Sequence, residues 1–263
     1  ISWWYFHWDT ERTDTEIASD FVKRLGSDFL VSLFGVRLLL VFFEQDLFDI
    51  DDENQVKLLE ILLDKLWAFT KETPDTETLV VSLKILQYYI KLPGFLKLLP
   101  DIITFLTKSI SRISNATDPY GKAVFNLLTS TLKAFPNIEF TIEFTRTLVS
   151  FCNSQLDIHE SCGTIFGTLL LIMDRKQNIP EIYDTATMAF ESMIRALSAP
   201  VRKYSALLCS KFLILYQLNP KKFLNHIQFV LGNLSSKKAS ARCTLLTFLK
   251  HFISDAPTEK FEK

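Results

Sequence analysis

Basic residues gather at the starts of three consecutive expected helices near the end of the chain. They are Arg202, Lys203, Lys221, Lys222, Lys237, Lys238 and Arg242. A cation in the first turn of a helix interacts unfavourably with the helix dipole and destabilises the helix by about 0.3–1 kcal/mol. Helix stability therefore does not explain these residues. Free backbone N–H groups beside lysines form a site for anions. The pattern predicts contact with nucleic-acid phosphates; a solvated basic edge, or a surface for an acidic protein, explains the same residues.

Charge is unevenly spread along the 263 residues, whose net charge is −1. Residues 1–79 carry 7 Lys+Arg against 17 Asp+Glu, residues 80–199 carry 11 against 10, and residues 200–263 carry 11 against 3. The three net charges are therefore −10, +1 and +8. Such polarity concerns partners rather than fold, and it predicts that the two ends bind different things.

No arrangement of residues predicts a catalytic or metal site. The run Asp49–Asn54, followed by Glu60, resembles a calcium loop, but its sixth position is Asn54 rather than glycine. A carboxylate-rich helix start explains it better. His159-Glu160 lacks the second histidine of a zinc-protease motif. We therefore expect no enzyme, no cofactor and no small-molecule substrate.

The cysteines and two glycines have structural interpretations. Cys152, Cys162, Cys209 and Cys243 stand far apart in helical apolar patterns, so we expect four small, reduced core residues. Gly163 and Gly167 lie four residues apart on an expected helix. Their simplest role is to let a neighbouring helix approach closely.

Helical periodicity positions these residues. Pro180, Pro200 and Pro220 stand twenty residues apart, and proline is tolerated in the first turn of a helix. The apolar residues between them recur at steps of three and four, which predicts one buried helix face. No apolar run reaches the roughly 20 residues that a membrane-spanning helix needs, so we expect no membrane partner.

We expect about twelve helices and no strand. Eight of them cover residues 14–25, 27–43, 52–71, 76–92, 93–113, 119–135, 138–153 and 157–173. Three more begin at residues 180, 200 and 220, and the last covers residues 236–254. Such helices, paired through short turns, predict an all-α, HEAT-like α-solenoid (an α-α superhelix) of about six helix pairs. Alternate helices of a solenoid begin on the same edge, so some of the basic residues are expected to form a stripe.

We interpret residues 1–263 as a single continuous HEAT-type solenoid fragment of a longer chain. The chain begins at Ile1 rather than Met, and residues 2–8 are dense in aromatic side chains, which are costly when exposed. A short N-terminal helix folded on its own core is the alternative interpretation.

A family resemblance covers residues 175–254. It rests on four stretches of the sequence: Arg175-Lys176-Gln177-Asn178-Ile179-Pro180-Glu181-Ile182-Tyr183-Asp184; Ser198-Ala199-Pro200-Val201-Arg202; Lys211-Phe212-Leu213 up to Tyr216-Gln217-Leu218; and His226 to Ser235. This order resembles the C-terminal region of the DRIM (down-regulated in metastasis) family. These are very large HEAT-repeat proteins associated with the small nucleolar RNA of the small-subunit processome. A weaker match reaches back to about Thr78, and residues 1–75 do not align.

The resemblance implies a nucleolar, non-catalytic scaffold that acts in pre-rRNA processing and 40S assembly. Its partners would be processome proteins and pre-ribosomal RNA. The sequence departs from the family pattern at Gln217, where the family has proline, and at Ser236-Lys237-Lys238, where the family has acidic residues. The lysines are thus a property of this sequence. The alternative is a HEAT-repeat adaptor that binds proteins in nuclear transport or in phosphatase/kinase signalling.

Overall fold

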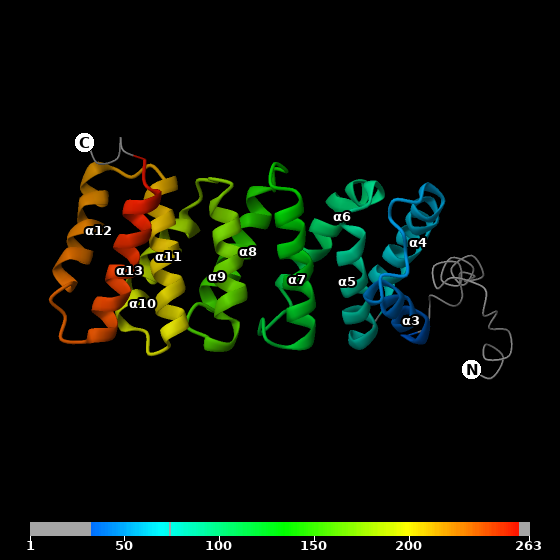
Figure 1. The fold of residues 1–263 in the computed structure, drawn as a ribbon, viewed down its shortest axis with the longest axis horizontal. Coiled ribbons are helices and arrows are strands. Elements are labelled where there is room, and N and C mark those ends of the chain that lie inside the picture. Colours follow the sequence, from blue (N-terminus) through cyan, green and yellow to red (C-terminus); the bar gives the residue numbers. More distant parts are fainter. Residues whose placement is uncertain (1–32, 74, 258–263) are drawn as a thin grey trace. The chain divides into compact units, whose positions relative to one another are not determined.

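A computed structural model describes residues 33–73 and 75–257 of the chain. In these ranges the regular elements are eleven α-helices and one 3-10 turn, and there is no strand (Figure 1). The predicted all-α class is therefore confirmed. The aromatic opening at 1–8, the expected helix at 14–25 and Pro74 lie outside the described residues.

Contacts within the chain group into two compact units, and the boundary between them in the sequence follows Phe105. The helices of the first unit are α3 (Leu33–Glu44), α4 (Glu53–Glu72) and α5 (Thr76–Tyr89), followed by α6 (Pro93–Ile110), whose last residues pass into the second unit. Helix α5 packs against both α3 and α4. At the heart of this unit Tyr89 is fully buried, and its ring lies 5.1 Å from the ring of Phe43.

The second unit contains seven helices and one 3-10 turn. They are α7 (Pro119–Ala134), α8 (Ile142–Ser154), the 3-10 turn η1 (His159–Ser161), α9 (Cys162–Met173), α10 (Pro180–Arg195), α11 (Ala199–Leu215), α12 (Pro220–Asn233) and α13 (Ala239–Asp255). Pro119, Pro180, Pro200 and Pro220 all lie in first turns, as predicted. Several starts also carry side-chain caps, and Asp118, Thr141, Ser198 and Asn219 each accept a backbone N–H bond.

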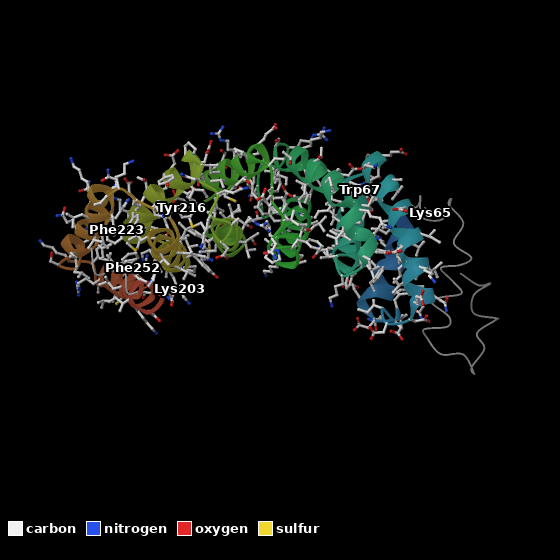
Figure 2. All side chains as sticks on the ribbon, turned by 90° about the horizontal axis from the view of Figure 1, so that it is seen from above. Lys65, Trp67, Lys203, Tyr216, Phe223 and Phe252 are labelled. Atoms are coloured by element: carbon white, nitrogen blue, oxygen red, sulfur yellow. The ribbon has the colours of Figure 1, made fainter. Side chains whose placement is uncertain are left out.

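The helices of the second unit contact one another in two series. Helices α7, α9, α11 and α13 pack in succession, and α8 packs on α10. Contacts between α8 and α9, α10 and α11, and α12 and α13 join the two series into two layers (Figure 2). We call the series α7, α9, α11 and α13 the odd layer.

The odd layer repeats at a constant spacing. Its members, with the 3-10 turn that leads into α9, begin at residues 119, 159, 199 and 239, which are forty residues apart. Buried positions recur at the same distance: Leu208 corresponds to Phe248, and Phe212 corresponds to Phe252. A helix pair of about 40 residues is the length of a HEAT repeat.

The expected helix at 93–113 is present; it ends at Ile110 and continues through Pro100, which is exposed, so that water can reach the carbonyl that loses its partner. Two local predictions are corrected. The expected helix at 157–173 begins as the separate 3-10 turn η1. Cys152, Cys162 and Cys209 are buried, whereas Cys243 is exposed and is not a core residue. All four thiols are free.

Candidate nucleic-acid interface

The structure divides the predicted basic residues between two edges of the second unit. Helices α11 and α13 begin at the same edge, and the antiparallel α12 begins at the opposite one (Figure 1). Five residues therefore share one edge, which we call the basic edge: Arg202, Lys203, Lys237, Lys238 and Arg242. Lys221 and Lys222 lie at the other edge, so the three helix starts do not form one stripe.

The two arginines of the basic edge have equivalent structural roles. Arg202 Nη1 donates to the carbonyl oxygens of Ala196 and Leu197, at 2.8 and 2.7 Å. Forty residues later, Arg242 Nη1 donates to the carbonyl oxygens of Ser236 and Lys237, at 2.6 and 3.2 Å. Each arginine thus closes the turn before its own helix and satisfies two carbonyl oxygens of that turn.

The three lysines of the basic edge are exposed. Lys203, Lys237 and Lys238 form no ion pair with any described residue. Figure 2 shows Lys203 at the outer rim of α11. One contact joins the turns before α9 and α11 on this edge, since His159 Nδ1 lies 2.8 Å from Ser198 Oγ. Exposed ammonium groups that share one edge are suited to contact phosphates.

At the opposite edge, Lys222 acts on a histidine one turn away. The His226 ring stacks on the Phe190 ring with centroids 4.4 Å apart. Burial lowers the pKa of His226 below its usual 6.5, and the charge of Lys222 lowers this pKa further. Lys222 therefore has an electrostatic role inside the fold.

The lowered pKa of His226 predicts that folding stability depends on pH. Because the unfolded chain binds a proton at this histidine more readily, stability should fall as the pH drops through 6.5. Thermal melts of the wild type should thus lose more between pH 7.5 and 5.5 than melts of His226→Gln. Lys222→Gln should fall between the two. Equal losses in all three proteins would contradict this assignment.

The odd layer has a charge pattern that our sequence analysis missed. Apart from Asp255 at the end of α13, its four helices contain no acidic residue. Their basic residues are Lys122, Lys133, Arg202, Lys203, Lys211, Arg242 and Lys250. The acidic residues of the other layer are Glu143, Glu181, Asp184 and Glu191. The signal is that α7, α9 and α11 lack acidic residues while α8 and α10 carry them, and it is visible only once helix boundaries are known; α12 also has none.

An open groove of about 350 Å³ crosses the odd layer. It is lined by Asn126, Thr129 and Lys133 of α7, by Gly163, Thr164, Gly167, Leu170 and Leu171 of α9, by Asp174, and by Lys211 of α11. A Cβ atom at Gly167 would meet nothing within 4 Å, and one at Gly163 only the Tyr204 hydroxyl at 3.7 Å. These glycines do not serve close helix packing, so that prediction was wrong; they keep the groove open.

No group of three or more His, Cys, Asp or Glu side chains among the described residues is placed to hold a metal ion. A second depression, of about 410 Å³ in the first unit, is lined by Lys57, Glu60, Ile61, Asp64, Gly94 and Lys97 and so mixes both charges.

Asp52, in the calcium-like run, accepts from the N–H of Asn54 as the cap of α4. Within the described residues, no helix has the length and apolar character needed to cross a membrane.

Comparison with known proteins adds no assignment. The chain matches no model of a known protein family, and no curated protein matches it.

Proposed function

We propose that this chain is a non-catalytic HEAT-type α-solenoid scaffold that binds RNA along its basic edge. One observation carries the proposal: a layer of helices repeats every forty residues and places five basic residues on one edge. A repeat array offers a long surface on which several partners can be held at once. The mechanism is holding rather than chemistry.

The solenoid architecture is supported by the way the second unit repeats. Each odd-layer helix contacts the next, and in the other layer α8 packs on α10. The matched hydrogen bonds of Arg202 and Arg242 show that a turn recurs together with its helix. Nearest-neighbour packing of this kind is the property that defines repeat proteins. One array of about six helix pairs through residues 1–263 stays a prediction.

The cellular setting is proposed from the resemblance of residues 175–254 to the DRIM family. It favours the small-subunit processome, pre-rRNA processing and 40S assembly in the nucleolus, with processome proteins and pre-ribosomal RNA as partners. Affinity tags on the full chain should then recover pre-ribosomal RNA and nucleolar proteins. Recovery of transport or signalling proteins without RNA would favour the other candidate.

That second candidate is a HEAT-repeat adaptor for protein binding in nuclear transport or in phosphatase/kinase signalling. The groove across α7, α9 and α11 is the observation that favours it. Grooves lined by both apolar and polar side chains are typical of sites for protein segments and small ligands.

The RNA proposal is tested by removing charge from one edge at a time. We expect Lys203→Gln/Lys237→Gln/Lys238→Gln to bind labelled oligo(U) and oligo(A) 20-mers more weakly and to an equal degree, because phosphate contacts carry no sequence information. The slope of log affinity against log salt should flatten by about 0.7 for each lost contact on a single strand. Filter binding over a salt series measures both.

The matched control is Lys221→Gln/Lys222→Gln at the opposite edge, which should bind as the wild type does. All five lysines are exposed, so each substitution should change stability by no more than about 0.5 kcal/mol. A basic-edge variant that keeps full affinity, or a wild type that binds no RNA at low salt, would refute RNA binding at this edge.

A further inference from the structure

We propose that the groove across α7, α9 and α11 binds an acidic segment of a partner protein, extended and bearing small apolar side chains between its carboxylates. The inference concerns a surface separate from the basic edge and does not depend on RNA binding there. It rests on the form of the groove and on the charges around it.

The floor of the groove is the backbone of α9. Gly163 and Gly167 present no side chain there, and the space above Gly167 is open for at least 4 Å. Leu170 and Leu171 are half-buried beside this floor. They give the groove an apolar surface, and covering that surface with apolar side chains of a partner is favourable. On the α7 side, the hydroxyl of Thr129 already donates to the carbonyl of Phe125 at 2.8 Å. Small apolar side chains fit such a floor.

Charge at the groove favours an acidic occupant. Lys133 is exposed and forms no ion pair with the described residues. Lys211 Nζ lies 2.7 Å from Asp174 Oδ1, so that this pair is neutral overall. Every charged residue within α7, α9 and α11 is basic, and this gives the surface around the groove a positive potential. A carboxylate near Lys133 would gain a partner that the chain itself does not supply.

A nucleic acid fits the groove less well than a peptide does. Single strands are held by stacking of bases on aromatic side chains, and none of the residues lining the groove is aromatic. Tyr204, whose hydroxyl lies close to Gly163, already stacks on Phe166 with ring centroids 5.9 Å apart.

The groove can be filled without disturbing the fold. Gly167→Leu should block it, because its new side chain enters open space. Gly232→Leu on α12 is the matched control, since a Cβ there also meets nothing within 4 Å but lies outside the groove. For charge, Lys133→Glu is paired with Lys122→Glu, an exposed lysine on the same helix that does not line the groove.

The probe is a fluorescein-labelled peptide of six Glu-Ala repeats, followed by anisotropy with the full chain at low salt. We expect Gly167→Leu and Lys133→Glu to weaken its binding at least tenfold, and both controls to stay within about twofold of the wild type, with circular dichroism showing all four folded. The variant with the three basic-edge lysines replaced should bind the peptide as the wild type does and bind oligo(U) more weakly. This result separates the peptide site from the RNA site. No binding of the peptide by the wild type, undiminished binding by Gly167→Leu, or displacement of the peptide by oligo(U) from the groove would overturn it.

Discussion

Replacing Gly121 by alanine is expected to destabilise the fold by about 2–3 kcal/mol, as overpacking of a tight contact does. Gly121 lies in the first turn of α7, where its N–H donates to Asp118 Oδ1 at 2.5 Å. A Cβ atom at this position would lie 2.5 Å from the carbonyl oxygen of Asn115 and 3.1 Å from the Cα of Ala116. Both are backbone atoms, which cannot move aside as a flexible side chain can.

Urea denaturation of the full chain measures this loss, with Gly167→Ala as the control. A Cβ at Gly167 meets nothing, so alanine in the middle of α9 should stabilise by about 0.5–1 kcal/mol through its better helix propensity. The two variants carry the same substitution with opposite expected signs. Equal stability of Gly121→Ala and wild type would mean that the turn before α7 does not pack on this helix as described.

Replacing Arg175 by methionine is expected to cost about 3 kcal/mol. The guanidinium donates to four carbonyl oxygens at the end of α7 and in the turn that follows, those of Leu132, Phe135, Pro136 and Ile138. It also lies 4.3 Å over the ring of Phe140. Methionine keeps the apolar stem but leaves these carbonyls without their donor. A hydrogen bond to a charged group contributes about 1.5–3 kcal/mol net, and water can bond some of these part-exposed carbonyls in place of the guanidinium.

A lysine at this position separates charge from geometry. Arg175→Lys keeps the charge but cannot bond several carbonyls through a planar fork, so it should recover less than half of the loss. Arg242→Met serves as the comparison, because Arg242 is exposed and bonds two carbonyls of its own turn. We expect a loss of about 1 kcal/mol there. Chemical denaturation of the three variants checks this order, and a loss for Arg175→Met no larger than that for Arg242→Met would contradict it.

The sequence by itself determined the helices in the described part of the chain and most of their starts. Proline in a first turn and a short polar cap act through bonds within a few residues, so Asp118-Pro119, Ser198 and Pro200, and Asn219-Pro220 could be interpreted without the rest of the chain. Apolar steps of three and four predicted the buried residues Val201, Leu208 and Phe212 of α11, whereas on α12 only Val230 is buried. The basic character of residues 200–263 follows from composition alone.

Only the tertiary structure decided which of these features act together. Lys221 and Lys222 resemble the other lysine pairs in sequence, but the reversal of direction at each helix places them at the opposite edge. Gly163 and Gly121 differ only in what lies near them: open groove for the first, and backbone atoms of the preceding turn for the second. Arg175 finds its carbonyls some forty residues earlier in the chain. Such contacts depend on how helices pack across long sequence separations, and no local pattern of residues encodes that packing.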